Sequence, residues 1–125
     1  MTIRWITPLL GTAPTLSVLQ DVDIHIVDVR DLVDKPGNRP DVVKLKIIEG
    51  YKLLLEDKKT VVCCDYGVSR SNAVAVGILS MHESITFENA VRRVLNATGE
   101  KEIKVAPLQA VRRALSIDEK ESHRA

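Results

Sequence analysis

Short apolar segments divided by turn-forming residues predict three strands along the chain. They lie at residues 4–6, 23–29 and 60–63. The second of them, DIHIVDV, has the β-branched content of a strand with one face better buried than the other. The third, TVVC, is short and apolar, which is typical of a strand in the middle of a sheet. Between the first two strands, Pro8 and Gly11 predict a turn at residues 7–11.

Two helices are predicted before the third strand. Residues 15–20 are compatible with a short helix. Apolar positions recur with a helical period from Val43 to Leu54, and Pro40 can occupy the first turn of that helix. The loop in front of it contains the sequence PGN, which is rich in turn formers.

Three further helices are predicted after the third strand. Residues 71–81 are apolar on all sides, which indicates a helix buried in the middle of the domain. An amphipathic helix over residues 86–97 should end at Gly99, and another begins at Pro107. The polar residues 117–125 are expected to form a fraying tail.

Strands that lead into helices through short turns predict an α/β fold with a small, mostly parallel central sheet flanked by helices. A chain of 125 residues is long enough for one domain with a real core, which we place at residues 1–116. Ligands of such sheets bind beyond the carboxyl ends of the strands. The turn that follows residues 60–63 lies at one of those ends.

Overall charge does not point to a polyanionic partner. Lys and Arg number 18 against 17 Asp and Glu, so the net charge of +1 gives no reason to expect binding to nucleic acid or to a membrane surface. The first residues lack the apolar core of a signal peptide, and no apolar run approaches the roughly 20 residues of a membrane span. We therefore expect a cytoplasmic protein.

The two cysteines are adjacent, and the three histidines are scattered along the chain. This arrangement predicts neither a disulfide framework nor a metal site. A reactive thiol in a reducing compartment fits the pattern better.

The turn CCDYGVSRSN, at residues 63–72, combines features that bind an anion. A strand, a loop with Gly67 and the first turn of a helix direct several backbone N–H groups at one point, where the helix dipole adds positive charge. Arg70 could donate two parallel hydrogen bonds to a phosphate. The same groups would stabilise the thiolate of Cys64, so its pKa should fall from about 8.5 into the range of roughly 3.5 to 7.5.

Residues 64–71 resemble the Cys-x5-Arg signature loop of the cysteine-dependent protein phosphatases. The run GVSRS resembles the dual-specificity branch in particular, and ITPLLGTA near the N-terminus is similar to that branch's opening strand and turn. The resemblance covers most of the chain except the tail. It implies the dual-specificity phosphatase fold and hydrolysis of phosphoesters without a cofactor.

Within this resemblance, Cys64 is the implied nucleophile and Arg70 the implied phosphate clamp. Ser71 is the implied hydroxyl donor that helps the sulfur to leave in the second step; its alternative is a helix cap. The remaining members of the phosphate-binding loop are Asp65, Tyr66, Gly67, Val68 and Ser69.

The family's general acid is an Asp on a loop about 30 residues before the cysteine. Asp34 precedes Cys64 by that distance, within the turn-rich sequence VDKPGN. Asp31 and Asp41 are the alternatives, although Asp41 fits better as a charge at the start of the following helix.

Three features depart from the family pattern. The residue before the nucleophile is usually His and here is Cys63. Asp65 brings a negative charge to the rim of the loop, and we expect its side chain to point outward into solvent. The chain also lacks obvious aromatic residues to wall a deep phosphotyrosine pocket, apart from Tyr66.

The expected substrate is a phosphorylated protein or another phosphoester, such as a 5′-phosphorylated RNA, a phosphoinositide or a sugar phosphate. Two other classes remain open. One is a phosphate-binding module that has lost turnover, against which the retention of Cys64, Arg70 and a suitable Asp argues. The other is a rhodanese-like or reductase-like sulfur enzyme, because DIHIVDVRD resembles a rhodanese strand and two thiols are adjacent.

Overall fold

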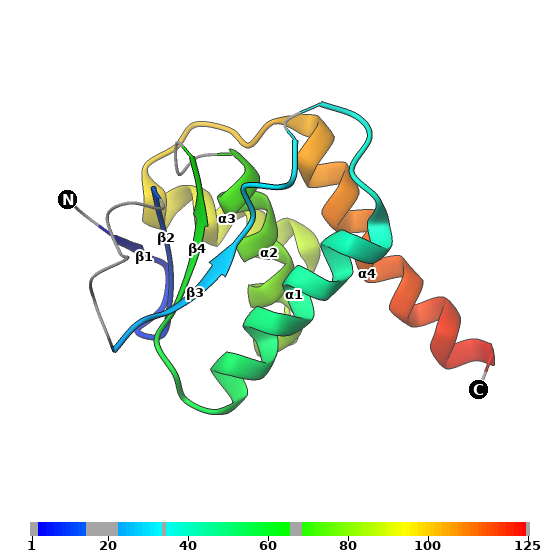
Figure 1. Ribbon diagram of the computed structural model, residues 1–125, viewed down its shortest axis with the longest axis horizontal. Coiled ribbons are helices and arrows are strands. Elements are labelled where there is room, and N and C mark those ends of the chain that lie inside the picture. The colour runs from blue at the N-terminus through cyan, green and yellow to red at the C-terminus, as the bar shows by residue number, and fades with distance from the viewer. Residues whose placement is uncertain (1–2, 15–22, 34, 66–68, 125) are drawn as a thin grey trace.

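A four-stranded, mostly parallel sheet forms the centre of the protein, as a computed structural model shows (Figure 1). The structure describes residues 3–14, 23–33, 35–65 and 69–124. The strands are β1 (Arg4–Trp5), β2 (Leu10–Pro14), β3 (His25–Asp28) and β4 (Thr60–Cys64). Their order across the sheet is β1-β2-β4-β3, with β2, β4 and β3 parallel and β1 antiparallel to β2. This confirms the predicted sheet.

Strand β4 lies in the interior of the sheet, and all five of its residues are buried. Side chains alternate between the two faces of a strand, so neighbouring residues of β4 belong to different clusters. Val62 and Cys64 pack in the main core, whereas Val61 and Cys63 pack in a small cluster with Ala13 on the opposite face. The two cysteines therefore face opposite sides of the sheet, as the alternation predicts.

Four helices cover the face of the sheet that carries the main core (Figure 1). They are α1 (Pro40–Leu55), α2 (Ser69–Glu83), α3 (Phe87–Thr98) and α4 (Val105–Arg124). Helix α2 contacts the sheet and the other three helices, which explains why its residues 71–79 are all buried. Residues 71–81 are thus apolar on all sides of the helix because protein surrounds it.

Local sequence signals define several helix ends. Pro40 is the first residue of α1, where its missing N–H has no consequence. The hydroxyl of Thr86 accepts a hydrogen bond from the backbone N–H of Asn89 at the start of α3. Gly99 ends α3 in the left-handed conformation, with φ of 75°. These ends confirm the predictions for α1 and α3.

Helices α1 and α2 approach each other closely at two glycines. A Cβ atom on Gly50 of α1 would lie 2.3 Å from Cδ1 of Ile78 on α2. Reciprocally, a Cβ atom on Gly77 of α2 would lie 2.7 Å from Cδ1 of Ile47 on α1. Each helix therefore offers a glycine to the isoleucine of the other, which brings α2 tightly against its neighbour.

The prediction of a turn over residues 7–11 is partly wrong. The turn ends at Leu9, where the Thr7 hydroxyl accepts hydrogen bonds from the N–H groups of Leu9 and Leu10. Residues 10–14 then form β2, a buried strand between β1 and β4. Its sequence, LGTAP, has a weak intrinsic strand preference, and pairing with both neighbours stabilises it. Gly11 serves close packing there, because a Cβ atom would lie 2.8 Å from Cγ2 of Ile3.

Two predictions about helices also need correction. Helix α4 begins at Val105, so that Pro107 occupies its first turn, and it continues to Arg124 through the segment predicted to fray. The segment contains Glu and Lys residues, which favour helix even where it is polar. The helix predicted at residues 15–20 lies outside the described residues. Within the part of the chain that the structure describes, no helix is long and apolar enough to cross a membrane.

Candidate active site

Two of the predicted catalytic residues lie at the carboxyl end of β4 and at the amino end of α2. Cys64 is the last residue of β4 and is buried, and Arg70 is the second residue of α2. A short connection that includes Asp65 joins these two elements. Tyr66, Gly67 and Val68, which we predicted as phosphate-binding residues, lie outside the described residues.

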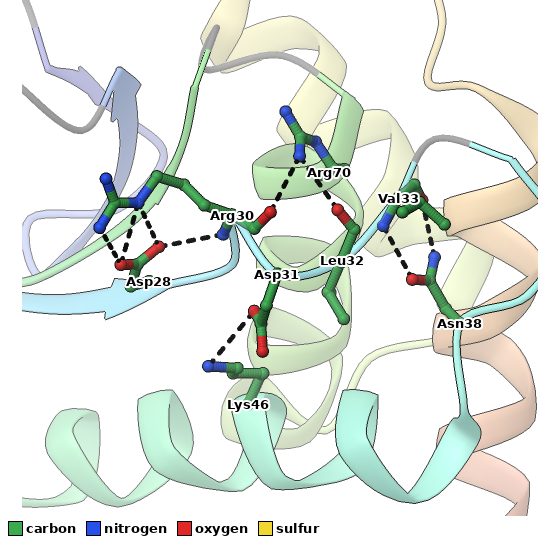
Figure 2. A network of polar contacts seen from close by, with 8 residues as sticks. All are labelled: Asp28, Arg30, Asp31, Leu32, Val33, Asn38, Lys46 and Arg70. Carbon is green, nitrogen blue, oxygen red and sulfur yellow. Dashed lines mark hydrogen bonds and ion pairs between the residues drawn. The ribbon is translucent and has the colours of Figure 1, made fainter.

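Arg70 connects the start of α2 to the segment that follows β3 (Figure 2). Its Nη1 donates hydrogen bonds to the backbone carbonyl oxygens of Arg30 at 3.3 Å and Leu32 at 3.0 Å. The Arg70 side chain is only 12% exposed. These bonds fix the plane of the guanidinium group and tie the loop after β3 to the predicted phosphate-binding loop.

The Asp65 carboxylate lies at the rim of the site and is about half exposed. Its Oδ2 is 3.8 Å from Nη2 of Arg70, within the range of an ion pair. The sequence led us to expect an outward, solvated side chain. The structure shows a side chain that is solvated and still close enough to act on the charge of Arg70.

The two serines beside Arg70 are both buried. The Ser69 hydroxyl accepts a hydrogen bond of 3.3 Å from the backbone N–H of Lys104, in the segment before α4. This bond holds Lys104 next to the first turn of α2. Ser71 has no exposed surface and lies one residue after Arg70, in the same turn of the helix.

Cys63 replaces the usual histidine with a buried thiol on the opposite face of the sheet. Its Sγ donates a long hydrogen bond of 3.8 Å to the carbonyl oxygen of Val61. Burial raises the pKa of Cys63 to about 12, and the negative charge of Asp28 acts in the same direction. Cys63 is therefore a neutral thiol at physiological pH and is unsuited to nucleophilic attack.

The described acidic residues near the site are engaged in ion pairs. Asp31 directs its carboxylate at Lys46 of α1, 3.6 Å away, on the side opposite Arg70 (Figure 2). Asp41 lies in the first turn of α1, where we predicted a negative charge at the helix start. Its carboxylate also forms an ion pair with Arg39. Asp34, the first candidate for the general acid, lies outside the described residues.

Asp28 forms a two-pronged ion pair with the Arg30 side chain (Figure 2). The hydrogen bonds from Arg30 lower the pKa of the Asp28 carboxyl below its usual value. A carboxylate held in the ionised form in this way is a poor proton donor, which makes Asp28 unsuitable as a general acid.

A cleft of about 530 Å³ opens beside Arg70. Its described wall consists of residues from the loop after β3, from α2 and from the segment before α4: Arg30, Asp31, Leu32, Val33, Lys35, Arg70 and Lys104. Lys35 and Lys104 could not be predicted from the sequence, because they are remote from the signature in the chain and become neighbours of Arg70 only through the fold. The two carbonyl groups that accept hydrogen bonds from Arg70 could not be identified from the sequence either.

Metal-ligating residues do not cluster in the part of the chain that the structure describes. No group of three or more His, Cys, Asp or Glu side chains is arranged there to hold a metal ion.

Comparison with known proteins places this architecture in one structural class. No protein-family model matches the sequence, and no curated protein matches it significantly. Among solved structures, a variant of human DUSP28 matches with a TM-score of 0.80 and 13% identity, over 97% of this chain and 99% of that chain.

Two further solved structures agree with this match. A leucine-rich repeat and phosphatase domain protein from Entamoeba histolytica matches with a TM-score of 0.75 and 12% identity, over 96% of this chain and 94% of that one. A human tyrosine phosphatase-like serine/threonine/tyrosine-interacting protein matches with a TM-score of 0.71 and 16% identity, over 92% of this chain and 96% of that one. The chain has the fold of the dual-specificity phosphatases, a branch of the cysteine-dependent phosphatases.

Proposed function

We propose that the protein is a phosphatase that hydrolyses phosphoesters, including phosphotyrosine and phosphoserine or phosphothreonine, through a phosphocysteine intermediate. The Cys64 thiolate attacks phosphorus, the bond from phosphorus to the ester oxygen breaks, and Asp34 gives its proton to that oxygen. Water then attacks the phosphocysteine and passes a proton to the Asp34 carboxylate, and the bond from sulfur to phosphorus breaks. The Ser71 hydroxyl donates a hydrogen bond to the departing sulfur.

The observation that carries this proposal is the placement of Cys64 and Arg70 on either side of one short loop. The thiol ends the interior strand, the guanidinium lies in the first turn of the buried helix, and both are at the carboxyl edge of the parallel strands. A helix amino end favours the thiolate and the phosphate alike. This placement supports a nucleophile and an anion receptor at the same edge of the sheet.

Arg70 fits the role of phosphate clamp because one part of its guanidinium group is already fixed. The hydrogen bonds from Nη1 to the carbonyls of Arg30 and Leu32 hold the guanidinium group at the start of α2, where its charge and planar donors suit a phosphate. An arginine held in this way needs little reorganisation when charge develops on the phosphoryl group.

The test is hydrolysis of a generic aryl phosphate by the wild type and by two cysteine variants. Cys64→Ser should abolish turnover and retain vanadate binding, because the backbone amides and Arg70 remain. Cys63→Ser, the matched control, should keep most of the activity, since that side chain lies on the other face of the sheet. Hydrolysis by Cys64→Ser at even a tenth of the wild-type rate would remove Cys64 from its role.

Phosphate binding without turnover is the second candidate. The observation in its favour is the Asp65 carboxylate 3.8 Å from Arg70, which would compete with a phosphate for the same guanidinium. Vanadate binding by the wild type without hydrolysis of any phosphoester would establish it. Assaying thiosulfate with cyanide in parallel tests the sulfur-enzyme alternative, for which the predicted activity is nil.

A further inference from the structure

The peptide group that joins Leu32 to Val33 is hydrogen-bonded by a side chain at each end (Figure 2). Its carbonyl oxygen, which belongs to Leu32, accepts a hydrogen bond of 3.0 Å from Nη1 of Arg70. Its N–H, which belongs to Val33, donates a hydrogen bond of 2.8 Å to Oδ1 of Asn38. The C=O and the N–H of a planar trans peptide group point in opposite directions. Asn38 and Arg70 therefore hold the same rigid unit from two sides.

Asn38 makes a second contact with this segment and stands directly before α1. Its Nδ2 donates a hydrogen bond of 2.7 Å to the carbonyl oxygen of Val33, so the amide binds both backbone polar groups of that residue. The next residue, Arg39, accepts a backbone hydrogen bond of 3.1 Å from Val43 in α1. Through Asn38, the start of α1 thus holds Val33 in one orientation.

The two ends of this peptide group are fixed by different means. The Leu32 side chain is buried in the main core, whereas Val33 and residues 35–37 are exposed. Packing therefore fixes the group on the Leu32 side, and the amide of Asn38 fixes it on the Val33 side. Without that amide the group can rotate about its flanking single bonds, which would turn its carbonyl oxygen away from Arg70. Hydrogen bonds at the two ends of one peptide group also strengthen each other by polarisation.

We propose that Asn38 is a positioning residue for Arg70 and thereby raises the affinity of the site for a phosphoryl group. This rests on the role of Arg70 as phosphate clamp in the proposed phosphatase. Asn38 is one of several groups that act on Arg70, because Nη1 also contacts the carbonyl oxygen of Arg30 and Nη2 lies 3.8 Å from Oδ2 of Asp65. The expected effect is therefore that of about one neutral hydrogen bond, which is about two- to tenfold in affinity.

Calorimetric titration with vanadate measures this effect without turnover, in proteins that all carry Cys64→Ser. Asn38→Ala should weaken vanadate binding about two- to tenfold. Asn38→Asp keeps an oxygen that accepts from the N–H of Val33, so it should recover most of the affinity. Asn96→Ala is the matched control, because it removes an exposed asparagine of α3 that does not line the cleft, and it should leave the affinity unchanged.

A double-mutant cycle shows whether Asn38 acts through Arg70. Arg70→Ala alone should weaken vanadate binding on the order of 10²-fold, because it removes charge-assisted hydrogen bonds. In that background Asn38→Ala should cause no further loss. Arg70→Met, which keeps the aliphatic stem, repeats the cycle with less disturbance of packing. Equal losses from Asn38→Ala with and without Arg70 would indicate a merely structural role and overturn the proposal.

Hydrolysis separates failure of this proposal from failure of the proposed function. With Cys64 intact, Asn38→Ala should lower kcat/KM by the same factor for phenyl phosphate and for an aryl ester with an acidic leaving group, since both carry the same phosphoryl group. A loss confined to phenyl phosphate would mean that Asn38 acts on the general acid, which would overturn its role toward Arg70.

The two proposals can also fail one at a time. If no phosphoester is hydrolysed but vanadate affinity depends on Asn38 only in the presence of Arg70, the phosphatase proposal fails and the positioning role stands. If the wild type hydrolyses both esters and Asn38→Ala binds vanadate as tightly as its parent, the positioning role fails and the phosphatase proposal stands.

Discussion

Arg70 illustrates how one residue can serve two elements at once. Its Nη1 secures the loop after β3 through two carbonyl oxygens, and its Nη2 lies 3.8 Å from Oδ2 of Asp65. A lysine could supply the charge but not the fork of donors in one plane. The guanidinium group therefore holds the loop after β3 against the start of α2.

Also at the residue scale, the general acid can be identified by its substitution, because the resulting loss of rate depends on the leaving group. Asp34→Asn should slow hydrolysis of phenyl phosphate by about 10² to 10⁴-fold, because the departing oxygen then lacks a proton donor. An aryl ester with an acidic leaving group should be slowed far less. The measurement is the ratio of kcat/KM for the two esters in each protein.

Asp31→Asn is the control for this experiment, since its carboxylate faces Lys46 rather than Arg70. It should leave the ratio of the two esters unchanged. Equal rate losses for good and poor leaving groups in Asp34→Asn would refute the assignment, and a leaving-group-dependent loss in Asp31→Asn would transfer the role to that residue.

The buried thiol of Cys63 predicts a particular sensitivity to alkaline pH. Because its pKa rises from 9.0 to about 12 on folding, the folded protein holds this proton more tightly than the unfolded chain. The contribution of the protonated Cys63 thiol to the free energy of unfolding is complete below pH 9 and is lost as the pH rises from about 9 toward 12. Linkage gives a loss of about 1 kcal/mol in the free energy of unfolding between pH 8 and pH 10.

Urea denaturation of the wild type and of Cys63→Val at the two pH values isolates this contribution. Valine has no proton to lose, so the variant should lose about 1 kcal/mol less than the wild type over that interval. All other titrating groups are common to both proteins. An identical pH dependence would show that Cys63 does not titrate with a raised pKa.

At the scale of secondary structure, the sequence was most informative where a local rule decides the outcome. The end of α3 at Gly99 and the start of α1 at Pro40 follow from backbone geometry that any reader of the sequence can apply. Strand β2 was misread because its small residues, a glycine and a proline give no local strand signal. Only pairing with β4, which is far away in the chain, makes it a strand.

In the candidate site, too, the features that lie close together in the sequence could be predicted, and those that the fold creates could not. Cys64 and Arg70 lie in one short segment of the sequence, so they could be recognised together. The contacts of Arg70 with the carbonyls of Arg30 and Leu32 could not be predicted, because every residue has a carbonyl group. Lys35 and Lys104 were missed for a related reason, since only the three-dimensional arrangement makes them part of one wall.

The close approach of α1 and α2 predicts a strong coupling between Gly50 and Ile78. Gly50→Ala should lower the free energy of unfolding by about 1 to 3 kcal/mol through overpacking, even though alanine favours a helix. In an Ile78→Val background this penalty should shrink, because the atom nearest to the new methyl group, Cδ1, is gone. Denaturant titration of the four proteins of this double-mutant cycle gives the coupling energy.

Ile47→Val provides the matched background, since Ile47 contacts Gly77 and not Gly50 at the close approach. There the Gly50→Ala penalty should be as large as in the wild type. A penalty of the same size in all three backgrounds would mean that the helices separate freely and that the two glycines do not set their spacing.

At the scale of the whole molecule, residues 1–116 should suffice for folding. Among the α4 residues whose burial the structure describes, those that join the main core are Ala110, Val111 and Ala114, and they precede the proposed boundary. The end of the helix projects away from the other elements (Figure 1). A chain that ends after Ser116 should therefore differ from the full chain by less than about 1 kcal/mol in its free energy of unfolding.

A chain that ends after Lys104 is the contrasting truncation, because it lacks α4 and its core residues. It should fail to show a cooperative unfolding transition. A loss of several kcal/mol in the chain that ends after Ser116 would place the domain boundary further toward the C-terminus.

The position of β4 between β2 and β3 has a consequence for the newly made chain. During synthesis, β2 leaves the ribosome with only β1 as a partner, and the strand that covers its other side follows about 50 residues later. At about 5 to 20 residues per second, the hairpin of β1 and β2 waits roughly 3 to 10 s with one edge unpaired. Strand β3 is made in that interval, but it too pairs with β4. Slow translation of residues 15–59 would lengthen the wait, so the yield of soluble protein depends on the speed of the ribosome over this stretch.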